Sequence, residues 1–246
     1  MPKLFNIGTN KRGLIVYGGE SSADFGMVIG EAPAYDKATR KTTTYSVPGR
    51  NGDIVIQEDA WSDVPRPYKV WIAKDLDDLT DMVNAFTAWL NSVKGYQRLE
   101  DSFEPDTFRL AYYNGGQNVS NELTQYGETT IQFICRAERF YKSGEQPITV
   151  SNGDKLFNFT RFASKPLIHI EGSGTVTVTI GDKTITAAVT DYINIDCDRQ
   201  NAYRLPTENK NTDISGTFPT IEPGESAVAI TGTITKLEIT PRYFTI

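Results

Sequence analysis

The chain has 246 residues, of which 39% are hydrophobic, and a formal net charge of −6. This length is enough for two domains of roughly 100–150 residues, each with its own core. The net negative charge argues against a nucleic-acid-binding surface. No window approaches the roughly 18 uninterrupted apolar residues that a membrane-spanning helix needs. The first residues also lack the apolar stretch of a signal peptide, so we expect synthesis in a cytoplasm, with no membrane partner.

The dominant sequence period is two, which is typical of β-strands. In the first 141 residues the pattern predicts strands at residues 14–17, 45–47, 54–57, 68–72, 107–112 and 129–136. The basic cluster KATRK at 37–41 is expected to lie in a solvated loop.

One segment departs from this period. Residues 77–93 have an apolar stripe at three-and-four spacing, with Asp77 or Asp78 as N-cap and Gly95 just past the end. We predict an amphipathic helix of about four turns that covers one face of the N-terminal sheet, which makes this half α+β. The stripe consists of Leu79, Met82, Val83, Phe86, Trp89, Leu90 and Val93.

The stretch VPGRNGD, residues 47–53, combines Pro48, Gly49 and Gly52 in one turn. Proline fixes φ and glycine permits positive φ, so this turn presents Arg50 and Asp53 on a stiff platform. Two interpretations stay open. Arg50 is either a docking group for another subunit or a side chain that pins its own loop.

A short linker at 142–147 is predicted to separate an N-terminal domain, 1–141, from a C-terminal domain, 148–246. In the second half, T-V-T-V-T-I at 175–180 followed by Gly181-Asp182 and residues 184–186 predicts a hairpin. Gly172-Ser173-Gly174 is expected to form a turn. Further strands are predicted at 167–171, 192–196, 227–230 and 234–240, at intervals typical of a β-sandwich.

Residues that carry enzymatic chemistry are sparse. The single histidine, His169, lies between two isoleucines on a predicted strand, where a hydrogen-bonded role is expected. Cys135 and Cys197 fall on apolar phases of strands and are expected to be buried free thiols. Two cysteines and one histidine in separate strands offer no metal-ligand spacing, and no phosphate loop or nucleophile elbow is present. We therefore predict a protein without catalytic activity, metal or cofactor.

Several unusual segments occur in a characteristic order. SADFGMVI at 22–29 precedes VPGRNGDI at 47–54, and the predicted helix follows. The C-terminal half then runs through SKPLIHIEGSGTVTVTIGDKTI at 164–185, YINIDCD at 192–198, GTFPTIEPGESAV at 216–228 and ITKLEITPRYFTI at 234–246. In this order, the segments resemble the distal tail protein family of long-tailed, non-contractile bacteriophages, over nearly the whole chain.

The resemblance implies a structural virion protein at the tail tip. Members of this family form a ring, typically a hexamer, through the N-terminal domain, whereas the C-terminal domain is a galectin-like β-sandwich. The ring joins the tail tube protein to the tail-associated hub protein and, in many phages, supports receptor-binding or other baseplate proteins of the host-adhesion apparatus. On this basis Pro48, Gly49, Arg50 and Asp53 are candidate subunit-interface residues.

Two further expectations concern the bore of such a ring and the alternative function. Viral DNA that passes through without specific binding favours an acidic or neutral lumen, and Glu100, Asp101, Glu104 and Asp106 are candidate lining residues, or else part of a solvated outer loop.

The alternative function is a carbohydrate-binding β-sandwich acting in host recognition. We rank it second because the C-terminal half lacks tryptophan and its strand faces alternate threonine with isoleucine or valine.

Overall fold

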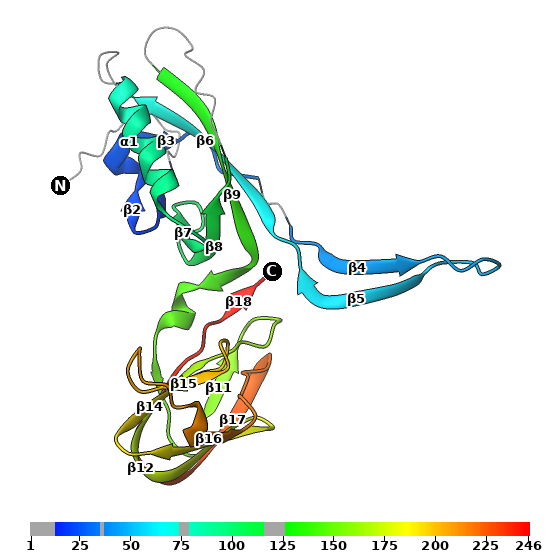
Figure 1. Ribbon diagram of the computed structural model, residues 1–246, viewed down its shortest axis with the longest axis vertical. Coiled ribbons are helices and arrows are strands. Elements are labelled where there is room, and N and C mark those ends of the chain that lie inside the picture. Colours follow the sequence, from blue (N-terminus) through cyan, green and yellow to red (C-terminus); the bar gives the residue numbers. More distant parts are fainter. Residues whose placement is uncertain (1–12, 35–36, 74–78, 116–125) are drawn as a thin grey trace. The chain divides into compact units, whose positions relative to one another are not determined.

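The computed structural model describes residues 13–34, 37–73, 79–115 and 126–246. The protein is mainly β, as predicted, and divides into two compact units, Met1–Arg139 with Ile246 and Phe140–Thr245 (Figure 1). No helix in the described ranges is long and apolar enough to cross a membrane. The elements of the first unit are β1 (Ile15–Tyr17), β2 (Glu20–Ser21), η1 (Ser22–Phe25), β3 (Met27–Ile29), β4 (Arg40–Tyr45), β5 (Ile54–Trp61), β6 (Val64–Ala73), α1 (Leu79–Ser92), β7 (Gln97–Asp101), β8 (Thr107–Tyr113) and β9 (Tyr126–Tyr141), which ends in the second unit.

The main sheet of the first unit closes on itself. Its strands follow the order β2-β1-β7-β8-β9-β6-β3. Gly13, just before β1, then pairs with Ile29 of β3, with N···O distances of 2.9 and 2.8 Å in the two directions. The Cβ of any other residue at position 13 would lie 2.2 Å from the Phe103 ring, so a side chain here would displace that ring. Closure satisfies backbone groups that an open edge would leave unpaired.

Helix α1 covers this sheet with the apolar stripe that the sequence predicts. Phe86, Trp89 and Leu90 are buried, and Met82 and Val83 pack at the margin of the same core. The Trp89 indole N–H donates to the carbonyl oxygen of Tyr17 at 3.1 Å, which ties the helix to β1. Gly95 has φ of +70°, as expected after a helix end, whereas the predicted N-cap at Asp77 or Asp78 lies outside the described residues.

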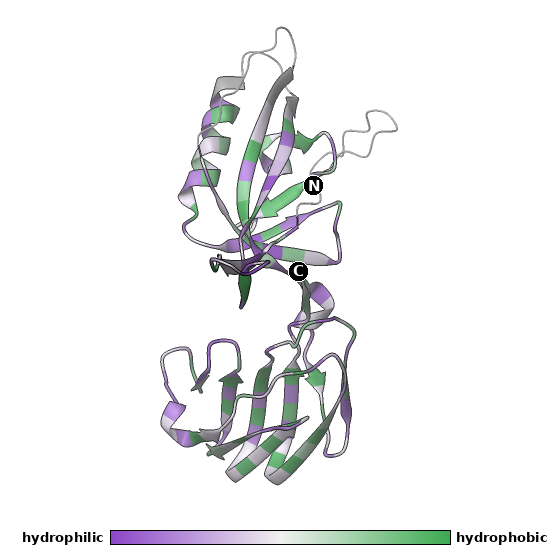
Figure 2. Ribbon diagram, turned by 90° about the vertical axis from the view of Figure 1, so that its right-hand side faces the viewer, coloured by the Kyte–Doolittle hydropathy of each residue, from purple (hydrophilic) through white to green (hydrophobic). Residues whose placement is uncertain are grey.

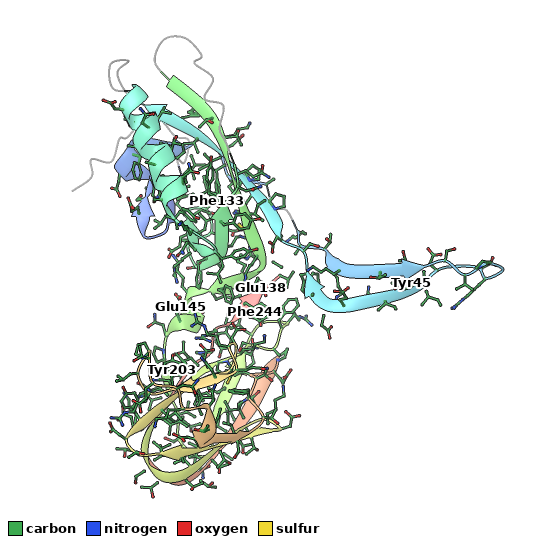
Figure 3. All side chains as sticks on the ribbon, viewed as in Figure 1. Tyr45, Phe133, Glu138, Glu145, Tyr203 and Phe244 are labelled. Carbon is green, nitrogen blue, oxygen red and sulfur yellow. The ribbon has the colours of Figure 1, made fainter. Side chains whose placement is uncertain are left out.

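Aromatic rings fill the core beneath the helix. The Phe133 ring, labelled in Figure 3, contacts the rings of Tyr17 and Tyr68 at centroid distances of 4.8 and 6.0 Å. Cys135 follows on the same inward face of β9 and is a buried free thiol, as predicted. Burial raises the pKa of this thiol to about 11, so it stays protonated and unreactive at neutral pH.

The second unit is a β-sandwich built around two long strands. Its elements are η3 (Lys142–Glu145), β10 (Ile148–Thr149), β11 (Lys155–Asn158), β12 (Leu167–Ile180), β13 (Lys183–Val189), β14 (Tyr192–Asp196), β15 (Asn201–Tyr203), η4 (Asn211–Asp213), β16 (Ile214–Gly216), β17 (Gly224–Thr240) and β18 (Phe244–Thr245). The central sheet has the order β10-β17-β12-β13-β16, while β11 pairs with β17, and β14 pairs with β12 and β15. Figure 2 shows hydrophobic and hydrophilic residues alternating along these strands.

Strands β12 and β17 bend where glycines allow their backbones to approach. A Cβ at Gly172 would lie 2.3 Å from the Thr233 carbonyl oxygen, and one at Gly232 would lie 2.4 Å from the Thr175 carbonyl oxygen. The register of the β12–β17 pair shifts here, between Glu171 and Gly172 and again before Thr177. The predicted turn at 172–174 is therefore wrong, because the chain continues as one bulged strand. The strands predicted at 227–230 and 234–240 likewise form the single strand β17.

The predicted hairpin between β12 and β13 is confirmed. Ile180 pairs with Lys183 across Gly181, whose φ is +63°. The inward side chains of β12 are buried, while Thr177 and Thr179 on the outer face are hydrogen-bonded through their hydroxyls to Thr186 and Thr184 at 3.1 and 2.9 Å. Cys197 is a buried free thiol, and burial raises its pKa to about 12.

Arg242 and Tyr243, just before β18, are held within the second unit by hydrogen bonds and one ion pair. The predicted linker at 142–147 contains the 3-10 turn η3, and the Tyr141 N–H before it donates to the Tyr243 carbonyl oxygen at 2.9 Å. Arg242 forms a two-pronged ion pair with buried Asp196, with Nη1–Oδ1 at 2.7 Å and Nη2–Oδ2 at 3.0 Å. Burial alone would raise the pKa of Asp196, but the hydrogen bonds from Arg242 and from the backbone N–H of Arg199 lower it.

Candidate subunit-docking surface

Strands β4 and β5 follow β3 and precede β6 along the chain. They form a separate two-stranded hairpin that extends from the first unit (Figure 1). The predicted strand at 45–47 is misplaced, because β4 ends at Tyr45, and the basic cluster predicted as a loop contributes Arg40 and Lys41 to β4. Tyr45 pairs with Ile54 and Thr43 pairs with Ile56. Because paired residues share a face, these four side chains form one face of the hairpin.

That face is apolar and exposed. Tyr45, Ile54 and Ile56 have 55%, 40% and 50% of their surface accessible, and Tyr45 stands on the hairpin in Figure 3. On the opposite face Val55 is also exposed, and every residue from 41 to 59 is exposed to solvent. An isolated two-stranded hairpin is marginally stable in water, and contiguous exposed apolar side chains mark interaction sites. The hairpin therefore has the composition of a docking element.

The tip of the hairpin adopts the turn that its sequence predicts. The Arg50 N–H donates to the Val47 carbonyl oxygen at 3.2 Å, across Pro48 and Gly49, whose φ is +82°. Proline followed by a glycine of positive φ defines a type II turn. Gly52 also has positive φ, at +83°. Arg50 and Asp53 are exposed, and neither side chain forms an ion pair with another described residue.

The base of the hairpin is fixed by Arg40. Its guanidinium lies 4.9 Å from the Trp61 ring centroid and its Nη1 lies 3.2 Å from an Asp59 carboxylate oxygen. Arg40 also donates to the Glu58 carbonyl oxygen at 3.3 Å, near a register shift between Arg40 and Thr42. These contacts hold the base and leave the apolar face and the tip uncovered.

The acidic run at 100–106 has a different environment. Asp101 is buried, and Glu104 has a side chain only 11% exposed, while Glu100 is paired with Arg98 and Asp106 is exposed. The lining of a channel by these four carboxylates stays a prediction. Asp106 is the most exposed of these four residues in the single chain.

Asp101 and Glu104 join three arginines in a buried cluster, here called the arginine cluster. Arg66, which is 2% exposed, donates from Nη2 to Asp101 at 2.9 Å, and the Tyr68 hydroxyl donates to the same oxygen at 2.8 Å. Glu104 accepts from Arg139 Nη1 at 2.9 Å. Its other oxygen lies 3.5 Å from the Nη2 atoms of both Arg66 and Arg109.

The electrostatics of the arginine cluster follow from burial and pairing. Burial alone would lower the pKa of Arg66, but Tyr68 and Asp101 raise it. Burial raises the pKa of Tyr68 well above its usual value, and the negative charge of Asp101 raises it as well. Burial and the charge of Arg66 lower the pKa of Arg109. The cluster therefore cross-links β6, β7, β8 and β9 by mutual charge compensation, a structural role.

Sequence reasoning missed these arginines. Arg66 lies between two prolines in VPRPY, and Arg109 and Arg139 alternate with apolar residues on β8 and β9. A basic residue on the inward phase of a strand is a signal for a buried ion pair. The sequence alone gives no partner for it, because Arg66 and Asp101 are 35 positions apart.

Comparisons with known proteins agree with this architecture. The model of the phage tail protein RIFT-related domain matches residues 31–135, a segment that includes the hairpin and most of the closed sheet. This segment is therefore similar to the RIFT-related domain of phage tail proteins. No curated protein gives a significant match to the chain.

Solved structures share the fold of almost the whole chain. The crystal structure of the distal tail protein Dit (gp 19.1) of phage SPP1, described as a paradigm of the hub adsorption apparatus in phages that infect Gram-positive bacteria, matches with a TM-score of 0.75 and 11% identity. The match covers 96% of this chain and 100% of that chain. Two structures of the phage p2 baseplate in its activated conformation, one with Sr and one with Ca, match with a TM-score of 0.50 and 11% identity, covering 93% of this chain and 97% of theirs. The resemblance to distal tail proteins drawn from the sequence is thus confirmed.

Proposed function

We propose that this chain is a structural component of the tail tip of a long-tailed bacteriophage, where copies of the chain assemble into a ring, as a hexamer. The observation that carries the proposal is the exposed β4–β5 hairpin, within the segment that matches the phage tail protein domain. In the ring, the apolar face of the hairpin packs against the adjacent subunit. The chain acts in assembly and not in catalysis.

The hairpin suits a head-to-tail contact for two reasons. Burying each of its large apolar side chains contributes roughly 1.5–3 kcal/mol, which compensates for the marginal stability of two strands alone. A type II turn of proline and glycine fixes the angle at which Arg50 meets the neighbouring subunit. A ring made from heterologous contacts closes only if that angle is the same at every interface. Arg50 is then a docking group for a carboxylate or for backbone carbonyls of the neighbour.

The ring would stand between the tail tube protein and the tail-associated hub protein, and would support the receptor-binding or baseplate proteins of the host-adhesion apparatus. These partners follow from the resemblance to distal tail proteins. The lumen is expected to be acidic or neutral, with Glu100 and Asp106 as the candidate lining carboxylates outside the arginine cluster, so that DNA passes without being held. A lumen lined by Lys37, Arg40 and Lys41 in a structure of the assembled ring would contradict this expectation.

The test of the hairpin interface compares two isoleucines of equal exposure. Ile54, on the hairpin face, is 40% exposed, and Ile148, on β10 of the second unit, is 39% exposed. We expect Ile54→Ser to weaken each subunit contact by about 1.5–3 kcal/mol and to abolish the ring, while Ile148→Ser leaves it unchanged. Light scattering over a concentration series measures the mass of each variant.

The parent chain should reach a mass near six copies in the same series. A parent chain that stays monomeric throughout, or equal ring formation by both variants, would contradict the proposal. Arg50→Ala separates the two roles left open for this residue. A folded chain that no longer forms rings supports docking, whereas an unfolded chain supports an internal structural role.

A further inference from the structure

One outer face of the second unit has a composition unlike the rest of its surface. The threonine-rich outer face of β12 and β13 begins at Thr175, but the first half of β12 carries His169 and Glu171 outward. Strand registers place the neighbours of these residues directly. His169 pairs with Asn194 of β14 and with Glu238 of β17, and Asn194 pairs in turn with Tyr203 of β15.

A second row runs beside the first. Glu171 pairs with Tyr192 of β14 and with Lys236 of β17. The residues between the two rows point inward, and all are buried in the sandwich core, which fixes the seven outward side chains on one surface. This surface, here called the polar face, consists of Glu238, His169, Asn194, Tyr203, Lys236, Glu171 and Tyr192.

Hydrogen bonds hold the centre of the polar face in a defined arrangement. The Asn194 side-chain amide donates from Nδ2 to the Arg204 carbonyl oxygen at 3.4 Å, which turns its Oδ1 toward His169. His169 Nδ1 therefore donates to Asn194 Oδ1, at 2.8 Å, and the other ring nitrogen lies 3.3 Å from a Glu171 carboxylate oxygen. These contacts use only part of the capacity of the amide and of the carboxylate, so both retain acceptor sites toward solvent.

Aromatic rings lie within this polar set. The Tyr192 ring centroid is 5.6 Å from that of His169, and the Arg204 guanidinium lies 5.6 Å from the Tyr192 centroid. Arg204 Nε is buried and makes no hydrogen bond in the described part of the protein. Tyr203, labelled in Figure 3, adds a second ring at the β15 end of the face.

We propose that the polar face binds a neutral saccharide. A pyranose presents hydroxyls that both donate and accept hydrogen bonds, together with a C–H face that packs on an aromatic ring. The polar face offers the matching set: an amide, a histidine, two carboxylates and an ammonium group beside Tyr192 and Tyr203. This activity goes beyond the assembly role and does not depend on ring formation. It corresponds to the alternative function that the sequence ranks second, and it gains support because the outer face beside His169 and Glu171 is not the threonine surface that the strand pattern predicts.

Charge and residue composition favour this ligand over other classes. Glu171, Glu238 and nearby Asp191 are balanced by Lys236 and Arg204, whose Nη2 lies 3.7 Å from Asp191. A nearly neutral surface gives no phosphate or polyanion an electrostatic advantage. The seven side chains include no aliphatic residue, so the face does not form a contiguous apolar patch of the kind that marks a protein-docking surface.

The experiment presents the full chain to an immobilised panel of neutral oligosaccharides built from glucose, galactose, rhamnose and N-acetylhexosamines, with sialylated and phosphorylated glycans alongside. The strongest neutral hit is then titrated by calorimetry. We expect saturable binding to at least one neutral saccharide. Binding to none of the panel overturns the proposal, and binding to the acidic glycans alone overturns the assignment to a neutral ligand.

Paired variants assign the binding to this face. Tyr192→Ala is expected to weaken the affinity about tenfold or more, whereas Tyr192→Phe, which keeps the ring, changes it less than about threefold. Glu171→Gln is also expected to weaken binding about tenfold. The matched control is Glu225→Gln. Glu225 lies at the start of β17, away from the polar face, and its carboxylate pairs with Lys155.

Circular dichroism and light scattering of each variant show whether fold and assembly are retained. Glu171→Gln preserves size and shape, so it decides the question if Tyr192→Ala lowers the folded fraction. A saccharide that binds to Tyr192→Ala and to Glu171→Gln as tightly as to the parent chain would place the site elsewhere and overturn the proposal.

Discussion

The two units are stabilised by different kinds of interior. The core of the first unit is rich in aromatic residues, with Tyr17, Tyr68, Phe86, Trp89 and Phe133 buried, and it adjoins the arginine cluster. The buried cluster of the second unit consists of aliphatic side chains and Cys197, and Phe218 packs at its margin. Stability in the first unit therefore depends on a few specific buried pairs, whereas in the second it is spread over many small apolar contacts.

The same contrast appears on the surfaces. The first unit exposes an apolar hairpin that lacks a core of its own, while the second exposes polar side chains fixed by the sheet beneath them. An apolar surface on two strands suits contact with another protein subunit, and a polar surface on a rigid sheet suits a hydrated ligand. This difference supports the two separate roles that we propose, assembly for the first unit and ligand binding for the second.

The largest effect should come from breaking the arginine cluster. Arg66→Met leaves Asp101 buried with the Tyr68 hydroxyl and backbone N–H groups as its remaining partners, and we expect a loss of about 3–5 kcal/mol in the free energy of unfolding of the first unit. All three tryptophans lie in this unit, so fluorescence during denaturant unfolding follows it selectively. The double variant Arg66→Met with Asp101→Leu should recover most of the loss, and no recovery would show that the charges do not compensate each other.

A smaller effect is expected from the single ion pair Arg242–Asp196 in the second unit. Because the folded pKa of Asp196 is lowered, this pair contributes stability above the unfolded pKa of about 4 and loses it as the pH falls through the folded value. Arg242→Met should cost about 1.5–3 kcal/mol at neutral pH, and the difference from the parent should shrink below pH about 4. Hydrogen exchange of the backbone amides of β14 and β17, followed as a function of pH, measures this loss of stability.

Lys165→Met is the control for this pair. Lys165 lies 3.2 Å from Asp198, but both side chains are 55% exposed, so its loss should change stability by less than about 1 kcal/mol at any pH. A pH dependence equal to that of Arg242→Met would mean that general charge, and not the buried pair, sets the acid sensitivity.

The last comparison concerns two glycines with similar backbone angles, one with an effect of moderate size and one with almost none. Gly232 has φ of +101° and a carbonyl oxygen 2.4 Å from its Cβ position, whereas Gly49 has φ of +82° and open space around it. Gly232→Ala should destabilise the second unit by roughly 1–3 kcal/mol, because strain and a backbone clash combine. Gly49→Ala should leave global unfolding within about 0.5 kcal/mol, since it strains only the exposed hairpin tip. Equal thermal shifts for both variants would show that the clash at the β17 bend is relieved without cost.

The sequence by itself determined the local elements and the resemblance to distal tail proteins. Alternation over 175–186 with Gly181-Asp182 predicts the β12–β13 hairpin, the stripe of α1 predicts which side chains it buries, and proline-glycine at 48–49 predicts the turn. These features depend on side chains two to four positions apart, so the pattern and the structure that it produces lie in the same short segment.

Only the tertiary structure decided which distant residues meet. The sheet closes because Gly13 reaches Ile29, the bulge at Gly172 continues β12 where a turn is predicted, and Arg66 finds Asp101 on another strand. The polar face likewise combines residues of four strands whose sequence separation hides their proximity. Strand order and register set these contacts, and they depend on long-range packing that no local period encodes.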